Sequence, residues 1–249
     1  MQEKLPVRKG VYILPNLFTT ASLFTGFMAV IWASQGNFEW SAMGILFSAL
    51  MDGLDGKVAR LTRTSSEFGV QYDSLADLAA FGIAPGFMAY AWLLKDYGNI
   101  GTTAAFLFAT CSALRLARFN VAAAAGGSKK FFVGMPTPAA GCTLATLVFF
   151  VPYLPEFFMP ALPGFALILT ILLGFLMVSR VRYYAFKEFG FITAHKFSSM
   201  VTAILLFVLI SSAPKLLGFL MFFGYLVAGI VYTYVILPRK AAHQPIIKL

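Results

Sequence analysis

Four aspartates are concentrated in one part of a chain that has only ten acidic residues. They are Asp52, Asp55, Asp73 and Asp77. Two precede and two follow a polar turn centred near residue 64, at nearly equal distances from it. A pair of antiparallel helices folded at this turn would place Asp55 level with Asp73, and Asp52 level with Asp77 about one turn deeper. The spacing therefore predicts a cluster of four carboxylates.

Such a cluster is typical of a site for divalent cations. Four like charges so close together cannot all stay ionised alone, and a divalent cation relieves their repulsion. Ligands that are all oxygens favour Mg²⁺, Mn²⁺ or Ca²⁺ over zinc. Metal ions held by carboxylates with open positions for phosphate are the usual arrangement for phosphoryl-group transfer.

Small and basic residues flank the aspartates at helical spacing. Gly56, Ala59 and Arg60 lie on the same arc of the first helix as the two aspartates there, and Gly69 lies on the matching stripe of the second helix. The two glycines leave room for a bulky ligand, or they only let helices pack closely. The planar guanidinium of Arg60 suits phosphate, or the residue only marks the membrane surface.

The composition places this cluster in a membrane protein. Hydrophobic residues make up 59% of the 249 residues and charged residues only 12%, whereas soluble domains are nearer half apolar and a quarter charged. The 27 Phe and 10 Tyr exclude a disordered chain, and two Cys exclude a disulfide scaffold. We therefore expect an all-α, polytopic membrane bundle.

The apolar stretches set the expected number of spans. A transmembrane helix needs about 20 mostly apolar residues. Eight stretches are candidates: 14–34, 40–60, 70–94, 100–123, 136–153, 160–179, 197–213 and 216–237. No small-residue cleavage site follows the first stretch, which is therefore expected to stay in place as an anchor. The four aspartates fall in the second and third stretches.

The basic residues predict the orientation. Of the 19 Lys and Arg residues, all but Lys95 and Lys215 fall in the terminal tails or in alternate connections, with helix ends counted in. Positive residues accumulate on the cytoplasmic side, so both termini and the aspartates are expected there, in the cell (inner) membrane. The net charge of +9 then reflects topology and anionic headgroups, with no indication of nucleic acid.

The aspartates also belong to a longer pattern. Residues 52–60, followed by Gly69, Asp73 and Asp77, resemble the signature of the CDP-alcohol phosphotransferases. The pattern is D-x-x-D-G-x-x-A-R, eight residues, then G-x-x-x-D-x-x-x-D, and the chain meets every position. The resemblance implies a six-helix core over residues 1–195, with residues 196–249 forming two additional helices and a cytoplasmic tail.

Within that family the chain is most similar to the integral-membrane phosphatidylserine synthases. The supporting segments are residues 14–19, 68–77, 115–120, 134–141 and 179–183. The phospholipase-D-like serine synthases need paired H-x-K-x-x-x-x-D motifs, which His195 and His243 do not fit. The resemblance implies a reaction of phospholipid biosynthesis, in which CDP-diacylglycerol and L-serine give phosphatidylserine and CMP.

The resemblance also implies roles for individual residues. Asp52, Asp55 and Asp73 would ligate one or two metal ions, Mg²⁺ or Mn²⁺ with Ca²⁺ as a further option. Asp77 would bind the second ion and take the proton from the attacking hydroxyl. The residues expected to bind the CDP-lipid are Pro15, Asn16, Gly56, Ala59, Arg60, Ser66 and Gly69. A homodimer is also common among such proteins.

The sequence indicates the serine-binding residues less specifically than the metal ligands. Candidates are Arg115, Arg118 and Asn120 at the connection between the fourth and fifth spans, and Arg180, Arg182 and Lys187 between the sixth and seventh. One of these arginines would bind the serine carboxylate, although each could equally be a positive charge that sets topology.

Three alternatives remain open at the level of sequence. The first is another member of the same family, with glycerol 3-phosphate or inositol as the acceptor or an archaeal ether lipid as the donor. The second is a membrane aromatic prenyltransferase, whose two acidic motifs usually lie far apart rather than on one hairpin. The third is a cation transporter that uses the same carboxylates.

Overall fold

A computed structural model describes residues 13–62, 66–124, 131–184 and 213–236. Within these ranges the protein is almost entirely helical, as predicted. The α-helices are α1 (Ile13–Ser34), α2 (Phe38–Thr62), α3 (Glu67–Asp77), α4 (Ala84–Ala89), α5 (Asn99–Ala124), α6 (Thr137–Phe150), α7 (Leu162–Val178) and α10 (Pro214–Val231). Short 3₁₀ turns follow α6 at Val151–Tyr153 and precede α7 at Glu156–Ala161, and a π-helical turn at Tyr232–Ile236 extends α10.

The third predicted span is one continuous helix that contains α3 and α4. The helix begins at Glu67, where the Ser66 side chain caps it by accepting a hydrogen bond from the Gly69 N–H. Two π-helical segments, Leu78–Ile83 and Tyr90–Leu94, lie within it, and a 3₁₀ turn at Lys95–Tyr97 ends it. Pro85 has no N–H to donate, so an interruption of the regular hydrogen-bond ladder near it is expected.

Two glycines make the sharp turns between consecutive helices. Gly36 follows α1 with φ of 78°, and Gly98 precedes α5 with φ of 55°. Both values lie in the left-handed region, which only glycine adopts without a steric cost. These short connections keep α1 beside α2, and the long 67–97 helix beside α5.

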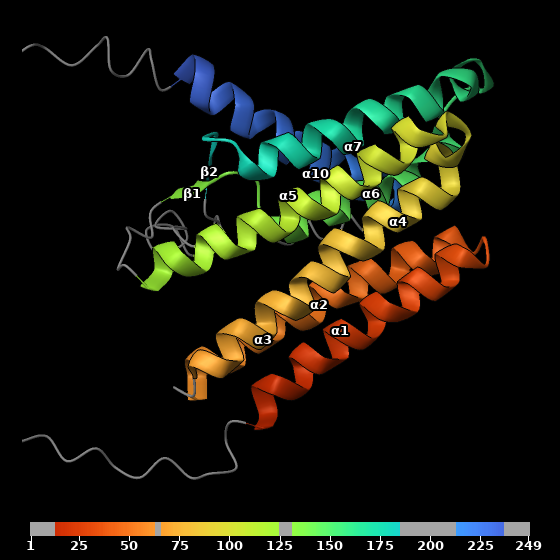
Figure 1. The fold of residues 1–249 in the computed structure, drawn as a ribbon. Coiled ribbons are helices and arrows are strands. Elements are labelled where there is room, and N and C mark those ends of the chain that lie inside the picture. Colours follow the sequence, from red (N-terminus) through yellow and green to blue (C-terminus); the bar gives the residue numbers. More distant parts are fainter. Residues whose placement is uncertain (1–12, 63–65, 125–130, 185–212, 237–249) are drawn as a thin grey trace, which may run out of the picture.

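The first helix holds the two aspartate-bearing helices in place. α1 packs along α2 and also against α3 and α4 (Figure 1). Among the described residues, α2 and α3 make almost no direct backbone contact with each other. The expected antiparallel pair is therefore bridged by α1 rather than packed tightly, which leaves room for side chains between α2 and α3.

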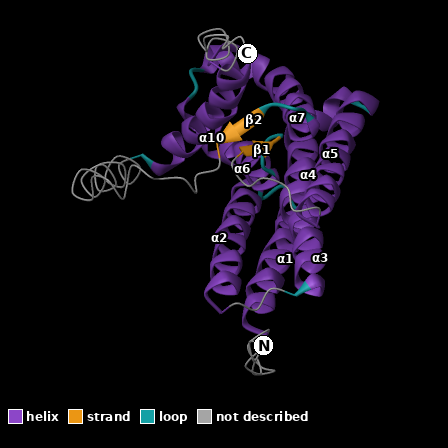
Figure 2. Ribbon diagram, turned by 90° about the vertical axis from the view of Figure 1, so that its left-hand side faces the viewer, coloured by secondary structure: helices purple, strands orange, loops and turns teal. Residues whose placement is uncertain are grey.

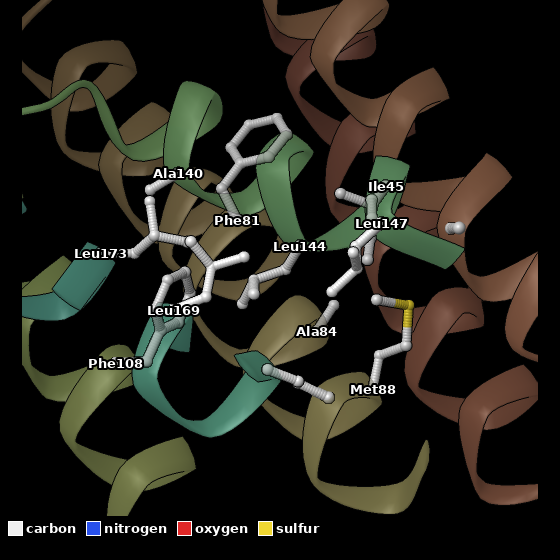
Figure 3. Packing of buried hydrophobic residues seen from close by; sticks show 14 of the residues in the cluster. Ile45, Phe81, Ala84, Met88, Phe108, Ala140, Leu144, Leu147, Leu169 and Leu173 are labelled. Atoms are coloured by element: carbon white, nitrogen blue, oxygen red, sulfur yellow. The ribbon is translucent and has the colours of Figure 1, made fainter. Parts of the chain in front are cut away.

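A buried core behind the aspartates joins the middle and late helices. Phe81, Phe108, Leu144, Leu169 and Leu173 all lie in it with almost no exposed surface (Figure 3). They come from the 67–97 helix, α5, α6 and α7, so the core couples four helices. Burial of such side chains stabilises a fold by about 1.5–3 kcal/mol each relative to exposure in water, although the hydrocarbon of a bilayer supplies part of that environment instead.

Two short strands are a feature that the sequence did not predict. β1 (Phe131–Val133) and β2 (Arg182–Tyr184) pair antiparallel, with Phe132 opposite Tyr183. They lie in the connections that follow α5 and α7, and Figure 2 shows them beside α10 and α6. The all-α prediction is thus correct for the bundle, while β-branched and aromatic residues add this small ladder at its edge.

The helices identify an integral membrane protein. Five are long and apolar enough to cross a bilayer: 16–34, 67–97, 99–123, 156–178 and 214–235. α2 has the length but carries the charged residues of the cluster, and the apolar helix at 137–153 is shorter than the others. All but the last residue of the candidate span 197–213 lie outside the described residues, so the count of eight spans stays a prediction.

Candidate active site

Three of the four aspartates come together between α2 and α3. One carboxylate oxygen each from Asp52, Asp55 and Asp73 lies within 4.8 Å of the other two. Asp55 is buried, with 6% of its surface exposed, and the other two are partly buried. Asp55 is seven residues before the end of α2, which is about 10 Å along a helix axis. The cluster therefore lies inside the bundle, near the end where α2 and α3 are connected.

Asp77 lies beside this trio and is not part of it. It is the last residue of α3, one turn beyond Asp73. Its side chain is within hydrogen-bonding reach of Asp52 and interacts electrostatically with Asp73 and Asp55. Asp77 therefore lies next to Asp52, as predicted. Its carboxylate is not among the three whose oxygens cluster within 4.8 Å.

The trio fits a hard divalent cation. Oxygen ligands lie about 2.0–2.6 Å from Mg²⁺ or Ca²⁺, so two oxygens on one ion are at most about 4–5 Å apart. The three carboxylate oxygens are within that limit of one another. No His or Cys belongs to the group, and an all-oxygen set disfavours zinc. Without a cation, three acidic groups at this separation would repel one another.

Thr19 is a residue of the site that sequence reasoning missed. Its hydroxyl donates a hydrogen bond of 2.8 Å to Oδ2 of Asp55, and both residues are buried. A hydrogen bond from outside the ligand set fixes the direction in which a ligating carboxylate points. Thr19 lies on α1, 36 residues away in sequence, so no local spacing pointed to it.

The start of α3 gathers several of the residues expected at a CDP-lipid site. Ser66 Oγ accepts from the Gly69 N–H at 3.0 Å, and Asn16 Oδ1 approaches the open face of Gly69. A Cβ at Gly69 would lie 3.1 Å from Ser66 Oγ and 3.7 Å from Asn16 Oδ1. A hydrogen bond of 2.9 Å between the hydroxyls of Thr20 and Tyr72 also ties α1 to α3 here.

For the remaining CDP-lipid candidates, the structure shows which helix carries each residue but no contact of its side chain. Gly56, Ala59 and Arg60 lie on α2, on the same helix as Asp52 and Asp55, and Pro15 lies in the first turn of α1. The side chains of Pro15, Ala59 and Arg60 lie outside the described part of the structure. Their contacts with a ligand therefore stay predictions.

Arg115 is the cationic candidate that faces the aspartates. It lies in the second half of α5, inside the predicted span 100–123, and is buried, with 7% of its surface exposed. Its Nη1 donates to Thr137 Oγ1 at 3.0 Å, and its guanidinium interacts electrostatically with Asp77. Its Nε has no hydrogen-bond partner among the described residues. The Nε of this guanidinium is therefore a hydrogen-bond donor that no described residue uses.

Arg118 has a different set of partners. It also lies within α5, inside the predicted span 100–123. Its guanidinium donates to the carbonyl oxygens of Val178 and Val133 at 3.0 Å each, with Met177 and Ser179 at 3.5 and 3.4 Å. Arg118 therefore caps the end of α7 and joins it to β1, as basic residues do at helix C-termini.

The other serine-site candidates either bond to other elements, are exposed, or lie outside the described residues. The Asn120 side chain donates to Ser74 Oγ at 3.0 Å and to Gln71 Oε1 at 3.1 Å, which joins α5 to α3. Arg180 is exposed, and Arg182 lies on β2 with its side chain outside the described residues. Lys187 also lies outside them. Of the six serine-site candidates, Arg115 is the one whose described side chain interacts with an aspartate of the cluster.

The chain is similar to known proteins over most of its length. A family model described as CDP-alcohol phosphatidyltransferase matches residues 12–176. The chain is 41% identical over 178 residues to the CDP-diacylglycerol–serine O-phosphatidyltransferase of Helicobacter pylori, a match that covers 72% of this chain and 74% of that protein. It is 33% identical over 190 residues to the protein of the same name from Methanocaldococcus jannaschii, covering 76% and 82% of the two chains. With the Bacillus subtilis protein of that name it shares 31% identity over 175 residues, which is 70% of this chain and 92% of that one.

Proposed function

The chain belongs to the CDP-alcohol phosphatidyltransferase family, and from that premise we propose that it transfers the phosphatidyl group of CDP-diacylglycerol to L-serine and releases CMP. The observation that carries the proposal is the trio of carboxylates from α2 and α3, set within 4.8 Å of one another in the helices that bear the family signature. Serine is proposed as the acceptor because the similar proteins carry serine transferase names.

Asp52, Asp55 and Asp73 are the residues that would hold a divalent ion, and Thr19 would orient Asp55 for that task. When bound, Mg²⁺ or Mn²⁺ supplies positive charge that neutralises the diphosphate and stabilises the departing CMP. Asn16, Gly56, Arg60, Ser66 and Gly69 are proposed to contact the CDP-lipid around this trio.

The acceptor is proposed to approach from the side of Asp77 and Arg115. Asp77 accepts the proton of the serine hydroxyl, and the serine oxygen forms a bond to the phosphorus that carries the lipid. The bond from that phosphorus to CMP breaks, so phosphatidylserine and CMP are the products. Arg115 binds the serine carboxylate, because its buried guanidinium adjoins Asp77 and its Nε has no hydrogen-bond partner in the described part of the chain.

The position of the site in the membrane supports this chemistry. The aspartates lie about 10–15 Å from the connected ends of α2 and α3, within reach of a headgroup while the acyl chains stay in lipid. We propose that this end faces the cytoplasm in the inner membrane, because the basic residues gather at the same connections. A homodimer is expected from the family resemblance alone.

The acceptor is tested by offering membranes that contain the protein CDP-diacylglycerol with labelled serine, glycerol 3-phosphate or inositol. We expect label to enter lipid only from serine, with one CMP released per lipid formed, because the similar proteins carry serine transferase names. Chelation by EDTA is expected to stop the reaction. Transfer to glycerol 3-phosphate or inositol without a serine lipid would overturn the choice of acceptor and leave the family chemistry intact.

A further inference from the structure

The C-terminal helix α10 contacts the acceptor side of the site although it lies outside the family match, which ends at residue 176. Sequence reasoning had no function for this part of the chain. α10 packs along α6 and reaches β2, as Figure 2 shows. It therefore adjoins the two elements that carry Thr137 and Tyr183.

A close contact fixes Tyr183 against this helix. Tyr183 of β2 has no exposed surface, and Gly229 of α10 is also buried. A Cβ added at Gly229 would overlap the Tyr183 ring, with the ring Cζ only 2.6 Å away. The ring thus lies directly on the α10 backbone, at a place that any other residue would obstruct. Tyr225, one turn earlier on α10, has its ring centroid 5.2 Å from that of Tyr183.

Two buried polar groups beside Tyr225 lack partners within the described residues. They are the hydroxyl of Tyr183 and Nε of Arg115. Arg115 lies near both Tyr225 and Asp77. Burial raises the pKa of Tyr183, so its hydroxyl keeps its proton and remains a donor. Buried donors are nearly always paired in proteins, so two unpaired donors next to the same aromatic ring indicate the place of a ligand that accepts hydrogen bonds.

We infer that α10 is a positioning element of the acceptor subsite, in which Tyr225 and Gly229 hold the Tyr183 hydroxyl and the Arg115 guanidinium so that both can donate to the carboxylate of an amino-acid acceptor. The inference rests on the proposed function and extends it to a helix that the family pattern does not include. Tyr225 acts through Arg115 and Tyr183, and Gly229 acts by leaving space for the ring. The C-terminal helix is then a determinant of which alcohol the enzyme accepts.

The chain offers a matched control for the test. Gly224 lies on the same helix, five residues before Gly229, is exposed, and a Cβ there would meet nothing within 4 Å. Full-length wild type, Gly229→Ala, Gly224→Ala and Tyr225→Phe are purified in detergent, and the KM values for serine and for CDP-diacylglycerol are measured separately. Thermal unfolding reports whether each variant is folded.

We expect Gly229→Ala and Tyr225→Phe to raise the KM for serine by about tenfold, which is the scale of losing one hydrogen bond to a charged group. The KM for CDP-diacylglycerol should change less than twofold, and Gly224→Ala should match wild type in both. Tyr225→Phe keeps the ring and removes only the hydroxyl, so it decides the matter if Gly229→Ala fails to fold.

Two results would overturn the inference. One is an unchanged serine KM in Tyr225→Phe, and in Gly229→Ala where that variant folds. The other is an equal rise in both KM values, which would show general damage rather than a role at the acceptor. Either result with an active wild type leaves the proposed function standing, whereas a wild type that makes no serine lipid would refute the proposed function itself.

Discussion

Replacing Asp77 by asparagine is expected to lower kcat by about 10²–10⁴-fold, the usual contribution of a positioned general base. Asparagine has nearly the same shape and can still donate a hydrogen bond to Asp52, so the packing at the end of α3 is preserved. Its amide cannot accept the proton of the serine hydroxyl. Because Asp77 lies outside the trio of clustered oxygens, binding of Mn²⁺ and of CDP-diacylglycerol should change little.

The measurement is CMP release by the purified variant at saturating serine, alongside Mn²⁺ binding followed by electron paramagnetic resonance. Asp96→Asn is the matched control, because Asp96 is exposed in the turn that ends the 67–97 helix. A variant that turns over like wild type would remove Asp77 from the role of base. A variant that loses Mn²⁺ binding would instead identify Asp77 as a ligand.

Replacing Asp73 by asparagine is expected to abolish metal binding. Loss of a partner outside the ligand set typically costs about 10–100-fold in metal affinity, and loss of a ligand should cost more. The protein without metal should be no less stable than wild type, because a neutral amide removes one of the repelling charges next to Asp52 and Asp55. Wild type should gain thermal stability from Mn²⁺ by mass action, and the variant should not.

Thermal unfolding with and without Mn²⁺ separates these effects from misfolding. The expected pattern is a normal unfolding temperature for Asp73→Asn without metal and no shift when Mn²⁺ is added. Activity should fall with the loss of binding. If Mn²⁺ stabilises Asp73→Asn as much as it stabilises wild type, Asp73 is not a ligand and the trio is not the metal site.

The arrangement of the aspartates could be predicted because it depends on helix geometry alone. Each residue of a helix adds the same rise along the axis, so residues equally far in sequence from the turn lie at the same height on the two helices. The structure confirms that Asp52, Asp55 and Asp73 lie together and that Asp77 adjoins Asp52. What the spacing could not show is that α1 separates the two helices and supplies Thr19 to Asp55.

The roles of the arginines could not be predicted from their positions. Arg115 and Arg118 are three residues apart on α5, and both are equally consistent with a positive charge at the membrane surface. In the structure one is buried beside Asp77, while the other donates to carbonyls at the end of α7. The difference depends on which face of α5 meets α6 or α7, and this is a tertiary property.

The β ladder and the contact of Tyr183 with Gly229 were missed for a related reason. Three-residue strands have no recognisable period, and their pairing joins segments about 50 residues apart. A lone glycine in an apolar helix indicates close packing but does not identify the partner. The number of membrane spans is also difficult to predict, because α2 is long enough to span a membrane but carries the charged residues of the active site.

Anomalous X-ray diffraction from crystals grown with Mn²⁺ locates the metal directly. We expect an anomalous peak between α2 and α3, about 2.0–2.6 Å from carboxylate oxygens of Asp52, Asp55 and Asp73. A peak elsewhere, or carboxylates turned toward separate partners with no ion between them, would show that these three aspartates do not form the metal site.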